Sequence, residues 1–70
     1  MKICEYIKFS LVEYELLGLI EHEGTCLNQG HYTCHVRNDQ FWYHCNDMHI
    51  NRSALPKSSS KAYLLFYVKR

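Results

Sequence analysis

Four segments of this sequence are rich in aromatic and β-branched residues, and short turn-forming segments separate them. Such residues favour extended structure, whereas the Gly, Asn, Asp, Pro and Ser residues between them favour turns. The sequence therefore predicts a mostly antiparallel β-sheet segment of about four to five strands, with strands at residues 14–23, 30–37, 40–46 and 61–68. A helix is an alternative for residues 14–23 because they are rich in Leu, but Gly18 in their middle favours a strand.

The length of the chain limits what it can do alone. Seventy residues form one small domain or part of a larger one. A composition that is 47% hydrophobic and 14% aromatic indicates a packed core rather than disorder. However, the apolar area that so few residues can bury barely offsets the conformational entropy lost on folding. Chains of this size often depend on disulfides, a metal ion or a partner, so we expect residues 1–70 to need a stabiliser outside the chain.

Charge and hydropathy argue against several classes of partner. The net charge is +1 and the basic residues are scattered, so no basic stripe predicts nucleic-acid binding. Glutamates and lysines interrupt every apolar run in the first twenty residues, so we expect no signal peptide and no membrane span. The chain is therefore expected in the cytoplasm, the nucleus or both, with its cysteines reduced. These are Cys4, Cys26, Cys34 and Cys45.

The segment around Asn38-Asp39 predicts a β-hairpin, because both side chains tolerate the left-handed conformation of a two-residue turn. Such a turn places Arg37 opposite Gln40 and, at the open end of the hairpin, His31 opposite Asn46. Directly opposed side chains are close enough to form a hydrogen bond. The other expected pairs are Val36–Phe41, Cys34–Tyr43 and Tyr32–Cys45 on an apolar face, and His35–Trp42 and Thr33–His44 on a polar face.

Five His and four Cys residues are numerous enough for a zinc site, but their spacing argues against one. The chain has no Cys-x-x-Cys motif, and the expected hairpin places Cys34 and Cys45 on the face opposite His31. A tetrahedral set would need residues outside the hairpin, such as His22 and Cys26. We therefore predict no metal site and no cofactor. The remaining imidazoles are expected to be ordinary surface or half-buried groups: His35, His44 and His49.

A cysteine nucleophile activated by an imidazole is a second interpretation of the same residues. His31 and Asn46 would supply the base and the group that orients it. Cys34 and Cys45 belong to the apolar face, where thiols are usually inert. Only Cys26, in the segment before His31, is expected to be exposed. The residues themselves thus supply a base and an orienting group but no convincing nucleophile.

Four motifs carry a family resemblance. They are Gly24-Thr25, Gly30-His31-Tyr32-Thr33, Trp42-Tyr43-His44-Cys45-Asn46-Asp47 and Ala62-Tyr63-Leu64-Leu65-Phe66-Tyr67. In this order and at this spacing, residues 14–70 resemble the C-terminal part of a ubiquitin-specific protease catalytic domain. The resemblance implies the α+β fold of the papain-like family, of which this chain would be mostly the antiparallel sheet.

The resemblance also implies roles for individual residues. His31 looks like the general base of a papain-like thiol protease, and Asn46 looks like the third member of its triad. Asp47 is similar to a neighbouring acidic position that assists. Residues 24–30 resemble the loop that folds over the ubiquitin tail, with Gly30 and Tyr32 beside the tail channel. The implied reaction is hydrolysis of the peptide or isopeptide bond after the terminal Gly of ubiquitin.

No part of the chain resembles the family's block that carries the nucleophilic cysteine. We therefore expect residues 1–70 to be a single partial domain, a fragment of a deubiquitinase that is inactive alone. The expected partners are ubiquitin or a ubiquitinated protein and the N-terminal part of the catalytic domain, which these residues lack. A non-catalytic module that binds ubiquitin or another partner is the alternative.

Overall fold

The structure is a computed structural model that describes residues 1–26 and 29–70, with the backbone alone described at residues 25, 26 and 29. No described residue belongs to a helix, so the described part contains no helical candidate for a membrane span. Its secondary structure consists of β1 (Tyr6–Phe9), β2 (Val12–Cys26), β3 (Gln29–Asn38), β4 (Phe41–Asn46), β5 (His49–Ser53) and β6 (Ala62–Lys69).

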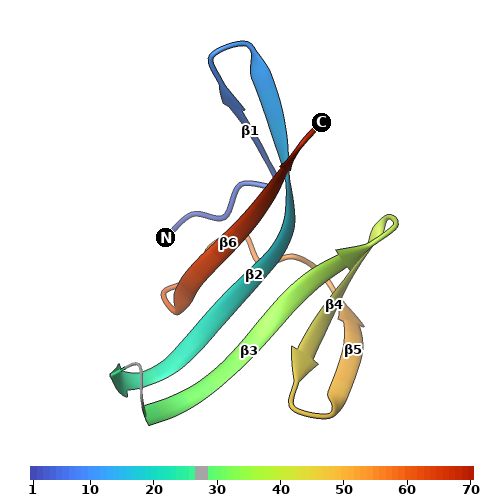
Figure 1. The fold of residues 1–70 in the computed structure, drawn as a ribbon. Helices are drawn as coiled ribbons and strands as arrows, with labels where there is room; N and C mark the ends of the chain where they lie inside the picture. Colours follow the sequence, from blue (N-terminus) through green and yellow to red (C-terminus); the bar gives the residue numbers. More distant parts are fainter. Residues whose placement is uncertain (27–28) are drawn as a thin grey trace.

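Strand β2 is the centre of a single antiparallel sheet (Figure 1). Its first part pairs with β1 and its later part with β3, while β6 pairs with its middle. Tyr14 pairs with both β1 and β6, and Gly18 pairs with both β3 and β6. Strand β6 therefore occupies one edge of β2, and β1 and β3 follow each other along the other edge. Strands β4 and β5 extend the sheet beyond β3.

A β-bulge in β2 brings two leucines into the core. Leu16 and Leu19 both have 0% exposed surface, although residues three apart point to opposite faces of a regular strand. The register between β2 and β6 shifts between Leu16 and Gly18, so that β2 contains one extra residue there. The bulge places both leucines on one face, where they pack with Ile3 and Trp42.

The N-terminal segment and the connection between β5 and β6 cover this face. The two segments are joined by backbone hydrogen bonds, one from Ile3 N to the Lys57 carbonyl (2.9 Å) and one from Ser59 N to the Met1 carbonyl (2.8 Å). The Tyr67 hydroxyl donates a hydrogen bond to the Cys4 carbonyl at 2.6 Å, which connects the N-terminal segment to β6. The core therefore lies between the sheet and a thin, irregular layer.

We expect Tyr67→Phe to lower the free energy of unfolding by about 1 kcal/mol, because the Cys4 carbonyl loses its donor. Burial, followed by the nearby Cys4, raises the pKa of the Tyr67 hydroxyl. The folded state thus favours the neutral phenol, and this contribution is present below the ordinary tyrosine pKa of about 10 and is lost as the pH rises further. Urea unfolding at pH 7 and pH 11 checks both points. The difference between the two chains should shrink at pH 11, and a difference that grew would contradict the assignment.

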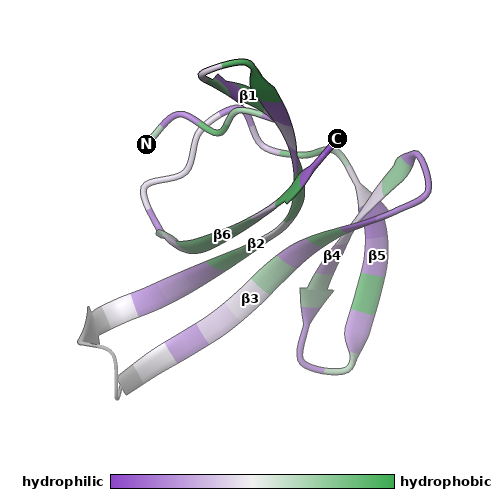
Figure 2. Ribbon diagram, turned by 45° about the horizontal axis from the view of Figure 1, so that its top comes forward, coloured by the Kyte–Doolittle hydropathy of each residue, from purple (hydrophilic) through white to green (hydrophobic). Residues whose placement is uncertain are grey.

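The other face of the sheet is open in the described structure. Leu17, Val36 and Phe66 are 40%, 38% and 50% exposed, and they line a shallow cavity of about 420 Å³. Figure 2 shows hydrophobic residues in β6, in the adjoining part of β2 and in the β1–β2 hairpin. Monomeric proteins rarely expose large contiguous apolar patches. This face is therefore compatible with the prediction of a partial domain.

The prediction of a mostly antiparallel sheet is confirmed, with six strands rather than four to five. Residues 14–23 are extended, as Gly18 indicated, and form part of β2. Strands β1 and β5 are additional. Both are short and all their residues are exposed. Strand β5 contains only one aliphatic residue and so lacks the composition that marks a strand, whereas β1 (Tyr-Ile-Lys-Phe) has that composition and lies outside the four predicted segments.

The predicted turn at Asn38-Asp39 is wrong by one residue. Asn38 pairs with Phe41, so the turn consists of Asp39 and Gln40, and Asp39 takes the left-handed conformation with φ 59°. The predicted partners across the hairpin are consequently displaced by two residues. The observed pairs are Cys34–Cys45, His35–His44, Val36–Tyr43 and Arg37–Trp42. Because this displacement is even, every side chain keeps its predicted face.

Candidate active site

His31 and Asn46 contact each other at the open end of the β3–β4 hairpin, with His31 Nε2 2.6 Å from Asn46 Oδ1. They are not direct partners, as the predicted register had them. The last regular pair of the hairpin is Cys34–Cys45. In the same register the next residue of β4, Asn46, lies opposite Thr33, and His31 lies two residues beyond Thr33 on the same face of β3. Diagonal neighbours of this kind are within reach of long side chains. The predicted contact between His31 and Asn46 is therefore present, although the two residues are diagonal neighbours rather than direct partners.

Gly30 determines how β3 approaches β2 immediately before His31. Its φ is 121°, and a Cβ atom added there would lie 1.9 Å from the backbone oxygen of Glu23. Only glycine fits such a conformation and such a close approach. The approach coincides with the irregularity in the β2–β3 pairing between Glu23 and Cys26. The backbone position from which His31 reaches Asn46 therefore depends on Gly30.

The hydrogen bond defines which nitrogen of His31 can act as a base. With the Asn46 carboxamide oxygen as acceptor, Nε2 of a neutral imidazole carries the proton and Nδ1 carries the free lone pair. His31 is half-buried, and it lines a cavity of about 260 Å³ together with Asn46, Thr33 and His44. The arrangement holds an imidazole in a fixed orientation beside a pocket, and such an imidazole can act as a general base.

Two other predicted site residues line a different cavity. Tyr32 and Asp47 contribute to a hollow of about 340 Å³ that Cys34 and Cys45 also line. Asp47 belongs to the β4–β5 turn with φ 54°, and in the described structure no hydrogen bond or ion pair joins it to His31. The Tyr32 ring contacts the Tyr63 ring at 6.1 Å between centroids. The assisting role of Asp47 and the tail contact of Tyr32 stay predictions.

The described thiols do not complete a catalytic pair with His31. Burial, followed by a hydrogen bond to Cys45, raises the pKa of the Cys34 thiol, which keeps it protonated at neutral pH. Cys34 and Cys45 are opposite each other and share the face that points away from His31. Cys4 belongs to the N-terminal segment that covers the core, and its backbone carbonyl accepts a hydrogen bond from the Tyr67 hydroxyl. The predicted exposure of the Cys26 thiol lies outside what the structure describes.

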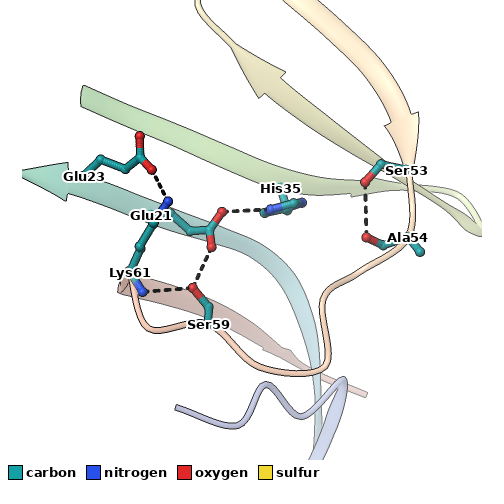
Figure 3. Close-up of polar contacts among 7 residues, drawn as sticks. All are labelled: Glu21, Glu23, His35, Ser53, Ala54, Ser59 and Lys61. Atoms are coloured by element: carbon teal, nitrogen blue, oxygen red, sulfur yellow. Dashed lines mark hydrogen bonds and ion pairs between the residues drawn. The ribbon is translucent and has the colours of Figure 1, made fainter. Parts of the chain in front are cut away.

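A polar cluster beside this site was not predicted from the sequence (Figure 3). The Glu21 carboxylate lies between His35 and Ser59, with Oε1 2.9 Å from His35 Nε2 and Oε2 accepting from the Ser59 hydroxyl at 2.6 Å. The His35 ring stacks on the His44 ring, with centroids 4.5 Å apart and an interplanar angle of 27°. His35 was predicted to be an ordinary histidine, yet it is only 8% exposed, and its Nδ1 has no hydrogen-bond partner among the described residues.

The charges around the cluster are balanced locally. Burial raises the pKa of the Glu21 carboxyl, but the hydrogen bonds from Ser59 and His35 and the imidazoles of His35 and His44 outweigh it, so the pKa ends below its ordinary value. Glu21 is consequently ionised at neutral pH. On the exposed side, the hydrogen bond and positive charge of Lys61 hold the pKa of Glu23 below its ordinary value.

Comparison with known protein families matches residues 3–67 to the family described as ubiquitin carboxyl-terminal hydrolase. The chain belongs to this family. The match includes the hairpin that carries His31 and Asn46, and it extends from the N-terminal cover through most of β6. The resemblance found in the motifs is thus confirmed.

Several ubiquitin carboxyl-terminal hydrolases are similar to this member of the family. Ubiquitin carboxyl-terminal hydrolase A of Dictyostelium discoideum is 38% identical over 58 residues, which is 83% of this chain and 7% of that protein. Hydrolase 25 of Arabidopsis thaliana is 42% identical over 57 residues, or 79% of this chain and 9% of that protein. Hydrolase 44 of Danio rerio is 37% identical over 60 residues, which is 81% of this chain and 9% of that protein. No solved structure gives a significant match.

Proposed function

We propose that this chain carries the general base and its orienting residue for a thiol-dependent deubiquitinase of the papain-like α+β class. The 2.6 Å contact between His31 and Asn46 is the observation that carries the proposal. The chain spans less than a tenth of the length of the three relatives described above. The nucleophilic cysteine, in this account, comes from a part of the catalytic domain outside the 70 residues, and the 70 residues alone are inactive.

The chemistry follows from the tautomer of His31. Nδ1 takes the proton of the thiol, and the sulfur attacks the carbonyl carbon of the terminal Gly of ubiquitin. The imidazolium then gives its proton to the leaving amine as the C–N bond breaks, which leaves a thioester. His31 next takes a proton from water, and the hydroxide attacks the thioester. The C–S bond breaks, and the imidazolium returns its proton to the sulfur, which restores the thiol and the neutral imidazole. Asn46 holds Nε2–H throughout, which stabilises the imidazolium and fixes the ring.

The remaining predicted site residues have supporting roles in the proposal. Gly30 lies beside the tail channel in this proposal, and it keeps β3 close to β2, because any side chain there would meet β2. Tyr32 presents an exposed ring beside the tail. Asp47, next in the chain to Asn46, contributes negative charge near the imidazolium. The proposed partners are ubiquitin or ubiquitinated proteins and the remainder of the catalytic domain, and the proposed location is the cytoplasm, the nucleus or both.

A chimaera tests the proposal. In the Dictyostelium relative, the 58 matching residues are replaced by those of this chain, and hydrolysis of ubiquitin with a C-terminal fluorescent amide is measured. We expect the chimaera to be active and the isolated chain to be inactive and unlabelled by a thiol-reactive ubiquitin probe. Labelling of the isolated chain would contradict the absence of a nucleophile. A chimaera that binds ubiquitin without cleaving it, with binding lost on Tyr32→Ala, would instead establish the non-catalytic alternative.

A further inference from the structure

The cluster of Glu21, His35 and His44 has no part in the proposed reaction. One carboxylate oxygen of Glu21 and one ring nitrogen of each histidine lie within 4.8 Å of one another. The three residues come from three consecutive strands, β2, β3 and β4, and share one face of the sheet. We propose that Glu21, His35 and His44 bind a divalent transition-metal ion of the zinc class.

The donor set matches the chemistry of such an ion. Imidazole nitrogens and carboxylate oxygens are ordinary zinc ligands, and two imidazoles with one carboxylate form a set that leaves a fourth position open. The cavity of about 260 Å³ that Glu21 and His44 line provides space for a water molecule at that position. The set contains no thiol, because Cys34 and Cys45 face away from it.

The donor atoms are already close together, but binding requires the His44 ring to rotate out of its stack on His35, because an imidazole ligates an ion that lies in its own ring plane. Ligand atoms about 2.1 Å from a tetrahedral zinc ion are roughly 3.4 Å apart. Glu21 Oε1 and His35 Nε2 are already 2.9 Å apart, and no separation in the set exceeds 4.8 Å. His44 is half-buried and lines the cavity, so the space into which its ring would rotate is on the cavity side of the stack. The strands therefore bring the three donors close to ligating positions before any ion binds.

Two further observations indicate a site rather than a chance grouping. The buried Ser59 hydroxyl donates to Glu21 Oε2, which leaves Oε1 directed at the histidines, as outer-shell partners of metal-binding carboxylates do. His35 is more than nine-tenths buried, and its Nδ1 lacks a hydrogen-bond partner among the described residues. No described donor holds Nδ1, so it is free to carry the ring proton while Nε2, the nitrogen that faces Glu21, ligates the ion.

The test is a titration of the whole 70-residue chain with Zn²⁺ by calorimetry, and with Co²⁺ by absorption spectroscopy. We expect one ion per chain and a Co²⁺ spectrum without thiolate charge-transfer bands. Glu21→Gln and His44→Gln should weaken binding at least 10-fold, since even outer-shell changes cost about 10–100-fold, and Ser59→Ala should weaken it by about 10-fold. His49→Gln, which removes an exposed imidazole of β5, is the matched control and should bind as the unchanged chain does.

Ring-nitrogen NMR of the unchanged chain keeps the proposal testable if a variant fails to fold. Zn²⁺ should shift the ring resonances of His35 and His44 and leave those of His49 in place. Failure of the unchanged chain to bind, equal affinity in Glu21→Gln and His49→Gln, or thiolate bands with Co²⁺ would each overturn the proposal. These readouts do not involve ubiquitin cleavage, so the metal site and the proposed function can fail separately.

Discussion

Alanine in place of His31 should lower kcat for cleavage of the ubiquitin amide by the chimaera about 10²–10⁴-fold, the range that a positioned general base contributes. The effect should fall on kcat with little change in KM, because His31 acts on the thiol and the leaving group rather than on the bound ubiquitin. Asn46→Ala should cost less, of the order of 10²-fold, because the base remains but its orientation and tautomer are no longer fixed.

His49→Ala is the matched control for both variants. It removes an imidazole from the exposed strand β5. His49 pairs with Asn46 across β4 and β5, but no described hydrogen bond or ion pair joins its side chain to His31 or to Asn46. Its kcat should stay close to that of the unchanged chimaera. If His31→Ala and His49→Ala had the same kcat, His31 would not be the base.

Leu19→Ala is expected to lower the free energy of unfolding of the chain by about 2–5 kcal/mol, the usual cost of truncating a fully buried leucine. Leu19 has no exposed surface and packs in the small core with Leu16 and Trp42. A complete domain of 70 residues has a total stability of roughly 4–10 kcal/mol at typical values per residue, and a partial domain has less. The substitution should therefore remove a large fraction of it.

Urea unfolding followed by tryptophan fluorescence measures this effect directly, because Trp42 is the single tryptophan and lies in the same core. Leu11→Ala is the matched control. Leu11 is 90% exposed in the turn between β1 and β2, so its loss should change stability by no more than about 0.5 kcal/mol. Equal effects of the two substitutions would show that the described core does not hold the fold together.

The sequence predicted the four longest strands and the faces of the central hairpin. Side chains of a strand alternate between its two faces, so the predicted faces stayed correct although the predicted pairs were displaced by two residues. The predicted register was wrong, because Asn38 and Asp39 both tolerate the left-handed conformation and only the structure shows that Asp39 adopts it. The bulge that buries both Leu16 and Leu19 also breaks the period and leaves no local signal.

The same limits apply to the site. His31 and Asn46 belong to one hairpin, so a local argument could bring them together. Glu21 belongs to β2, and the sequence between β2 and β3 contains no turn motif that predicts which residues of the two strands pair. Ser59 belongs to the irregular connection between β5 and β6. Alternation within residues 19–23 could have placed Glu21 on the same face as Leu19. It could not have placed Glu21 beside His35.

A double-mutant cycle on His31 and Asn46 tests the central claim, that these two residues act as one catalytic unit. In the chimaera, kcat is measured for His31→Ala, for Asn46→Ala and for the double variant. If Asn46 acts by orienting His31, Asn46→Ala lowers kcat only while His31 is present, and the double variant equals His31→Ala. If the two losses instead multiply in the double variant, Asn46 does not act through His31 and the account is wrong.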